Sequence, residues 1–280
     1  MKKYLSAAAN PQVGSTVFDP IAPLLGGVEA LLLDLDGVLY LSGEPLPQAA
    51  EFMAYLRASG RRFMAVTNNA RATPACYEGK LAGMGIELPA ERILTAGTAL
   101  AEYLRREEPR PAVHVVGSAV LRQTLRDADI EESERPDFVI VGIDPAVTVG
   151  QLSRAVRHIL AGARVLATNA DRLIPTRDGY EPECGAVAAF IEYATQRPIT
   201  VIGKPNPFIF RLALERLGAD PARALMVGDT LDTDIAGAKA AGLRSVLLET
   251  GSPIPPEHPA QPTLRLAGLA ELIRELRAGE

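Results

Sequence analysis

The sequence lacks two features: the many cysteines that build a disulfide scaffold, and the clusters of basic residues that bind polyanions. Its only two cysteines, Cys76 and Cys184, lie far apart and form no Cys-x-x-Cys pair, which argues against a disulfide framework and favours a reducing compartment. The net charge is −5, and basic residues occur only in scattered short groups. Because nucleic-acid readers usually carry clustered Lys and Arg, we expect no nucleic-acid partner.

Long apolar runs are also missing. No segment approaches the ~20 apolar residues that a bilayer-spanning helix needs, so we expect no membrane association. The weakly apolar stretch that ends at Ala9 is too short for a secretory core, and we expect a cytoplasmic protein. The three histidines, His114, His158 and His258, show no spacing suited to a metal site and are predicted to be structural.

Strand-like and helix-like segments alternate along almost the whole chain, the pattern of a parallel sheet flanked by helices. The fold class is therefore predicted to be α/β. Strands are predicted at 30–35, 62–67, 113–117, 138–143, 164–168, 199–202, 224–227 and 245–248. Thr73-Pro74 and Asn206-Pro207 are typical of helix starts, and Gly218 and Gly242 of helix ends.

Two proline-containing joints divide the sequence, and its 280 residues favour about two domains. The joints at 107–111 and 196–198 bracket enough strand-like and helical segments for a separate core. We therefore predict an inserted α/β domain at 110–197 and a discontinuous core domain formed by 1–109 and 198–280. A single continuous sheet with proline-rich loops is the alternative.

The segment 31–38 is an apolar run that ends in two carboxylates, Asp34 and Asp36, followed by Gly37. A buried parallel strand has such a continuous apolar run, and ligands collect beyond the carboxyl ends of such strands. Two close carboxylates require a cation, a proton or a basic side chain, so the pair indicates a metal site or acid/base chemistry. A simple Asp-Gly hairpin is the other interpretation, but a helical pattern, and not a returning strand, follows.

Two more predicted strands run into groups that suit an anion. Thr67 and Asn68 end one strand and offer a hydroxyl and backbone N–H groups. Lys204 lies between another strand and a helix start, where an anion is favoured. The simpler readings are a turn stabilised by polar side chains and an exposed lysine in a stiff loop.

A further strand runs through Gly228 into an acidic segment with Asp229, Asp232 and Asp234. Parallel strands would bring this segment to the same sheet edge as the other three. For Asp232 and Asp234 the simpler reading is stabilisation of a helix N-terminus.

In this order and combination, the motifs resemble those of the haloacid dehalogenase superfamily of phosphohydrolases. That family has Asp-x-Asp-Gly, then Thr, then Lys, then Gly-Asp with a later Asp, on a Rossmann-like parallel sheet. The matching residues here are Asp34, Asp36, Thr67, Lys204, Asp229 and Asp234.

The insert lies between the second and third motifs, as in family members with a type II cap. The chain looks most like the branch of nitrophenyl phosphatases, phosphoglycolate phosphatases and pyridoxal phosphate phosphatases. It departs from that branch at Asn169-Ala170-Asp171, where relatives often have Asn-Pro-Asp, and at 183–186, where they have a Pro-Gly-x-Gly-type turn.

The resemblance implies a Mg²⁺-dependent phosphatase of small phosphorylated metabolites. Asp34 would be the nucleophile that forms an aspartyl phosphate, and Asp36 the general acid and base. Thr67, the Asn68 N–H and Lys204 would bind the phosphoryl oxygens.

The metal ligands implied by the resemblance are Asp34, the Asp36 carbonyl and Asp229. Asp234 would orient the metal's waters or Lys204 rather than bind the metal itself.

The cap residues implied to select the substrate are Asn169, Asp171, Arg172 and Arg177, the two arginines being suited to a second anionic group. Relatives can also dimerise through the cap, so a homodimer is one expected arrangement. Two other functions stay open at this stage, a phosphotransferase or phosphomutase of the same fold, and a weakly active metabolite-binding module.

Overall fold

The computed structural model describes residues 24–176, 179–250 and 257–280. Its larger part is built on a six-stranded sheet with the order β14-β13-β12-β1-β4-β5, and each neighbouring pair is parallel. The strands are β1 (Ala30–Leu33), β4 (Arg62–Thr67), β5 (Ile93–Thr95), β12 (Ala224–Gly228), β13 (Arg244–Leu248) and β14 (Leu264–Leu266).

Helices cover both faces of this sheet, which explains why the strands are apolar throughout. In β1, Leu31 and Leu33 pack on one side, and Ala30 and Leu32 on the other. The first face carries α1 (Ala49–Ala58), α2 (Pro74–Ala82) and α9 (Leu269–Ala278). The second carries α3 (Ala96–Glu107), α7 (Pro207–Leu217) and α8 (Ala236–Ala241).

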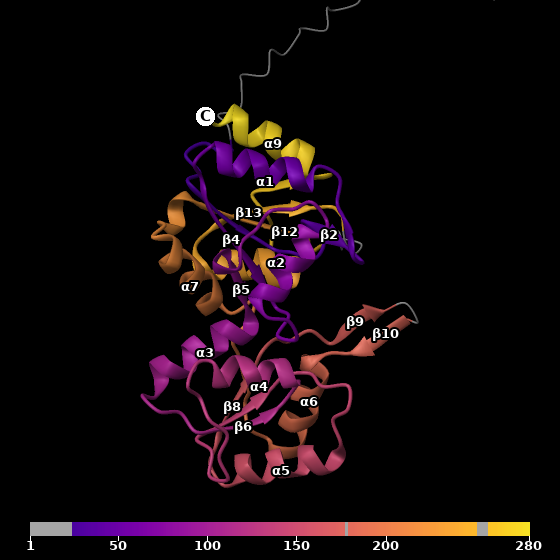
Figure 1. Ribbon diagram of the computed structural model, residues 1–280, viewed down its shortest axis with the longest axis vertical. Helices are drawn as coiled ribbons and strands as arrows, with labels where there is room; N and C mark the ends of the chain where they lie inside the picture. Colours follow the sequence, from indigo (N-terminus) through magenta and orange to yellow (C-terminus); the bar gives the residue numbers. More distant parts are fainter. Residues whose placement is uncertain (1–23, 177–178, 251–256) are drawn as a thin grey trace, which may run out of the picture.

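The smaller part, the cap, is a separate lobe with its own four-stranded parallel sheet of order β11-β8-β7-β6 (Figure 1). Helices α5 and α6 cover one face, and α4 packs on the other. The elements are β6 (Val113–Val116), α4 (Ala119–Arg126), β7 (Phe138–Val141), α5 (Val149–Leu160), β8 (Arg164–Ala167), α6 (Cys184–Thr195) and β11 (Thr200–Val201).

The two lobes share apolar packing through α3, which lies between them (Figure 1). One continuous cluster of buried side chains runs from Leu32 and Val66 of the large sheet, through Leu100 and Leu104 of α3, to Val115 of the cap sheet. The cap is therefore packed against the core and is not joined to it by linkers alone.

Two short hairpins complete the described architecture. One joins β2 (Tyr40–Leu41) to β3 (Glu44–Pro45), just after the acidic pair. The other joins β9 (Leu173–Thr176) to β10 (Gly179–Pro182) and projects sideways from the cap (Figure 1). This second segment had no strand prediction from sequence.

The α/β prediction is confirmed, with a parallel core sheet and a second α/β unit. The helix signals also hold, since Thr73 and Asn206 cap α2 and α7, and Gly218 and Gly242 end α7 and α8 in the left-handed conformation. Strand β11 pairs with β8 of the cap sheet, although the insert was predicted to end at residue 197. The exact domain boundaries stay a prediction.

No helix within the described ranges is both long enough and apolar enough to cross a membrane.

Candidate active site

Three of the predicted site residues come together because their strands are neighbours in the core sheet. The strand before Lys204 was expected at the same sheet edge, but it is β11, which pairs with β8 of the cap sheet. Strand β1 lies between β4 and β12, and all three run in parallel. Asp34 follows β1, Thr67 is the last residue of β4, and Asp229 follows β12. These side chains therefore collect at one edge, beyond the carboxyl ends of the central strands, where ligands bind in open α/β sheets.

A tight turn after β1 presents Asp34. Its backbone N–H donates to the carbonyl of Val227 at 2.9 Å, and its Oδ1 accepts from the Leu35 N–H at 2.7 Å. The Leu35 carbonyl then accepts from the N–H of Leu39 at 2.9 Å. Gly37 has a φ of +77°, which favours glycine, and any Cβ there would overlap the carboxylate of Asp229.

Lys204 is the central cation of the site. Its Nζ lies 2.9 Å from Oδ1 of Asp34 and 2.7 Å from Oδ1 of Asp234, and its side chain is 2 % exposed. Burial alone would lower the pKa of Lys204, but the two carboxylates outweigh burial and raise it above its ordinary value. Lys204 is therefore a fixed positive charge beside the proposed nucleophile.

Three carboxylates crowd around this one lysine. Oxygen atoms of Asp34, Asp229 and Asp234 lie within 4.8 Å of one another. Burial, together with the Asp234 charge, raises the pKa of Asp229 to about 6. Burial likewise raises the pKa of Asp34, with Lys204 acting in the opposite direction.

The donor set fits a divalent cation. Three ionised carboxylates and one ammonium carry a net charge of −3 + 1 = −2, which such an ion would neutralise. All of the donors are hard oxygen atoms, the type that Mg²⁺ and Ca²⁺ take. Asp234 is the least available of the three, because its Oδ1 contacts Lys204 and its Oδ2 accepts from the Thr230 N–H at 3.1 Å.

Asp36 differs from Asp34 in its surroundings. Its side chain is accessible to solvent, yet enough protein surrounds the carboxyl group for desolvation to raise its pKa. A hydrogen bond from Tyr40 and the charge of Lys80 act in the opposite direction. Lys80 places its ammonium 3.6 Å from the centre of the Tyr40 ring, a cation–π contact. An accessible carboxyl with a raised pKa suits a group that exchanges protons.

The loop after β4 contacts the segment that carries Lys204. Thr67 is buried, and its Oγ1 accepts from the N–H of Asn69 at 3.2 Å. The side chain of Asn68 reaches the Lys204 loop, where its Oδ1 accepts from the Lys204 N–H at 2.7 Å and its Nδ2 donates to the Lys204 carbonyl at 3.0 Å. The residues predicted to bind one anion are thus joined to each other.

The cap residues predicted from sequence do not share one environment. Asn169 is buried and donates from Nδ2 to the Asn68 carbonyl at 3.0 Å, while Asp171 accepts from the Asn68 side chain at 3.2 Å. Arg172 is exposed, and Arg177 lies outside the described residues. The structure therefore brings Asn169 and Asp171 to the core motifs.

Sequence reasoning missed the part played by the Asn68 side chain, for which only the N–H was predicted to act. It also missed Gly203, where a Cβ would overlap the Thr168 carbonyl and Oδ1 of Asn68. The available signal was the glycine directly before the motif lysine, since glycine often marks a close approach of two chain segments.

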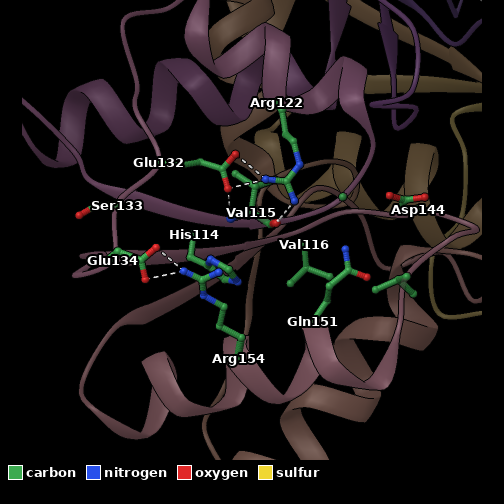
Figure 2. Close-up of a pocket in the computed structure, with 12 residues that line it drawn as sticks. His114, Val115, Val116, Arg122, Glu132, Ser133, Glu134, Asp144, Gln151 and Arg154 are labelled. Carbon is green, nitrogen blue, oxygen red and sulfur yellow. Dashed lines mark hydrogen bonds and ion pairs between the residues drawn. The ribbon is translucent and has the colours of Figure 1, made fainter.

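A cavity of about 330 Å³ lies elsewhere, at the edge of the cap sheet beside α4 and α5 (Figure 2). Four of its charged groups form two ion pairs, Arg122 with Glu132 and Arg154 with Glu134, and Asp144 also lines the cavity. Among the predicted site residues that the structure describes, none lines it.

Comparisons with known proteins agree with this arrangement. Residues 31–131 match the family model for haloacid dehalogenase-like hydrolases, and residues 201–272 match a second model of HAD-hydrolase-like proteins. The chain is 36 % identical over 245 residues to the dihydroxyacetone phosphatase of Corynebacterium glutamicum, covering 86 % of this chain and 89 % of that one. It is 35 % identical to the acid sugar phosphatase of Staphylococcus aureus, covering 80 % and 87 %.

A solved structure is also similar along nearly its whole length. The crystal structure of a 4-nitrophenylphosphatase from Thermotoga maritima superposes with a TM-score of 0.85 at 31 % identity, covering 90 % of this chain and 99 % of that one.

Proposed function

The chain belongs to the haloacid dehalogenase-like hydrolases and is a phosphatase of small phosphate monoesters, and we propose that it acts through a phosphoryl group carried on Asp34. The observation that carries this mechanism is the ion pair of Asp34 with the buried Lys204 at 2.9 Å. A carboxylate held beside a permanent cation, at the carboxyl edge of the sheet, is placed and charged as a nucleophile.

In the first step, an oxygen of Asp34 bonds to phosphorus while the bond to the leaving oxygen breaks. Asp36 donates its proton to that leaving oxygen, so the product departs as an alcohol. In the second step, Asp36 takes a proton from water, and the oxygen of that water attacks phosphorus. The bond to Asp34 then breaks, and inorganic phosphate leaves.

The remaining phosphoryl oxygens are assigned to Thr67, the Asn68 N–H and Lys204. The developing negative charge then lies among groups that are already in place, which is the main source of catalysis in phosphoryl transfer. Asp234, fully buried and bonded to Lys204, fixes the position of the ammonium.

Mg²⁺ is the cation we assign to the acidic cluster, with Asp34, Asp229 and the Asp36 carbonyl as its protein ligands. When bound, it would supply positive charge that offsets the repulsion between a carboxylate and a phosphate dianion. The net charge of −2 on the three carboxylates and the Lys204 ammonium supports a divalent cation at this site.

The substrates we propose are short phosphorylated sugars and polyols. Two of the relatives are named for dihydroxyacetone and acid sugar phosphatase activity, and the similar crystal structure is of a nitrophenylphosphatase. Within the proposed site, Arg172 stays a candidate for a second anionic group, and a homodimer through the cap stays a prediction.

Phosphate release from a panel of compounds tests the proposal. The panel contains nitrophenyl phosphate, sugar phosphates, phosphoglycolate, pyridoxal phosphate and nucleotides, each with Mg²⁺ and with chelator. We expect Mg²⁺-dependent release, with sugar phosphates ranked first. Consumption of the ester that requires an added acceptor alcohol, and that yields a phosphorylated acceptor in place of inorganic phosphate, would indicate a phosphotransferase. No reaction of any compound would contradict the proposal.

A further inference from the structure

The side chain of Asn68 is one of the links between the cap and the catalytic core. The amide oxygen, Oδ1, accepts a hydrogen bond from the Lys204 N–H at 2.7 Å. The amide nitrogen, Nδ2, donates to the Lys204 carbonyl at 3.0 Å and to the carboxylate of Asp171 at 3.2 Å. Asn68 therefore bonds to the loop of the catalytic lysine and to the cap at the same time.

The backbone of Asn68 is held by the cap as well. Its carbonyl accepts from Nδ2 of Asn169 at 3.0 Å, and Asn169 is only 2 % exposed. The Oδ1 atom of Asn169 in turn accepts from the Asp171 N–H at 3.0 Å, so the two cap residues brace each other. The hydrogen bonds that Asn169 and Asp171 make with this loop thus both end on Asn68.

Close backbone packing fixes this junction in place. The Gly203 N–H donates to the carbonyl of Thr168 in the cap at 2.9 Å, and no side chain fits at Gly203 between that carbonyl and Asn68. A second link lies nearby, where Arg71 and the buried Glu183 approach to 3.8 Å. The apolar cluster through α3 also joins the lobes, so residues 168–171 of the cap are packed against the core at this junction.

We propose that Asn169 and Asp171 are positioning residues for the phosphate pocket, which act through Asn68 on Lys204 and the 67–68 loop. The inference rests on the proposed phosphate-binding role of Thr67, the Asn68 N–H and Lys204. The cap then does more than choose substrates, because it holds part of the machinery that every substrate uses.

This assignment differs measurably from a substrate-contacting role. A residue that contacts the leaving group changes kcat/KM for one ester more than for another. A residue that positions the phosphate pocket changes kcat/KM by the same factor for all esters, and it also weakens the binding of inorganic phosphate, which has no leaving group.

The experiment compares the wild-type protein with Asp171→Ala and Asn169→Ala in the presence of Mg²⁺. For each protein we would measure kcat/KM on nitrophenyl phosphate and on a sugar phosphate, and the inhibition constant of inorganic phosphate. Asp171→Asn is the conservative variant, because its amide oxygen still accepts from Asn68. Thr148→Ala is the control, since it removes the N-cap of α5 in the cap and leaves the junction intact.

We expect the inhibition constant of phosphate to rise about fivefold in both alanine variants, the scale of one lost hydrogen bond, with equal losses of kcat/KM on the two esters. Asp171→Asn should restore both values, and Thr148→Ala should change neither. An unchanged phosphate inhibition constant, or a loss confined to one ester, would overturn the proposal.

A double-mutant cycle tests the route through Asn68, with circular dichroism to show that each of the four proteins is folded. On an Asn68→Ala background, Asp171→Ala should cause no further rise in the phosphate inhibition constant. Additive effects of the two substitutions would show that Asp171 acts by another path. A wild-type protein that hydrolyses no ester would count against the proposed function, whereas phosphate binding measured by calorimetry would still test the junction.

Discussion

Gly37 faces the carboxylate of Asp229 so closely that a Cβ at residue 37 would overlap it. The two residues come from the turns after adjacent strands, β1 and β12, and this approach lets both acidic turns contribute to one cluster. We therefore expect Gly37→Ala to displace Asp229 and abolish Mg²⁺-dependent phosphate release.

Gly43 provides a matched control for this substitution. It also has a positive φ, +91°, but no atom beyond its chain neighbours lies within 4 Å of the place that a Cβ would take, so Gly43→Ala adds backbone strain without a clash. Activity assays and thermal denaturation of both variants make the comparison. Equal activity of Gly37→Ala and Gly43→Ala would contradict a role for the close approach of Gly37 and Asp229.

Lys204 neutralises two buried carboxylates, and its removal should affect activity and stability together. Lys204→Met leaves Asp34 and Asp234 without their cation, so we expect kcat to fall by about 10²–10³-fold. The free energy of unfolding should fall by about 3–5 kcal/mol, as when one partner of a buried ion pair is removed.

The control is Lys239→Met, at an exposed lysine on α8. Urea denaturation and steady-state kinetics should show little change for that variant. A Lys204→Met protein with wild-type kcat would show that the lysine does not contact the reacting phosphoryl group.

Residue pattern alone predicted most of the buried strands, although it missed the buried β5, whose three residues are too few to show a pattern. The limits of β4 at 62–67 were predicted correctly, because apolar residues fill both faces and Thr67 ends the run. The β9–β10 hairpin was not predicted, because residues such as Leu173 and Tyr180 are exposed and give no burial pattern. The strand predicted at 199–202 was assigned to the core because the proline-containing joint at 196–198 was taken as the end of the insert, whereas β11 pairs with β8 of the cap sheet.

The residue pattern likewise predicted only part of the candidate active site. Asp34, Thr67 and Asp229 could be identified because each ends or follows a buried strand, and the order of the core sheet brings the three together. Lys204 follows the short strand β11 of the cap sheet, so its place in the site does not follow from the order of the core strands. The junction at Asn68 could not be predicted, since it depends on how the cap sits on the core. Turn-forming asparagines are also common wherever strands end.

Acidification should destabilise the cap through His114. Burial, then the neighbouring His158 and Arg154, lower the pKa of His114, and Glu132 acts in the opposite direction. The ring centres of His114 and His158 lie 4.8 Å apart, and His114 lines the cavity shown in Figure 2. The imidazole is therefore held in its neutral form in the folded protein.

The unfolded chain binds a proton at His114 more tightly than the folded protein does. The contribution of neutral His114 to folding stability is therefore complete above the ordinary histidine pKa of about 6.5, and it is lost as the pH falls through the lower folded-state pKa. The His114→Gln variant should lack the part of the acid-induced loss of stability that comes from protonation of His114. We expect the fall in Tm between pH 7.5 and 5 to be smaller in the variant by about 1–2 °C. Parallel curves for the two proteins would contradict this role for His114.

The most direct test of covalent catalysis is phosphate release by Asp34→Asn, measured with saturating nitrophenyl phosphate and Mg²⁺ beside the wild-type protein. The amide has nearly the shape of the carboxylate but is a far weaker nucleophile. We expect turnover to be lost while circular dichroism and the thermal transition show a folded protein. Turnover close to the wild-type rate would contradict a phosphoryl group carried on Asp34.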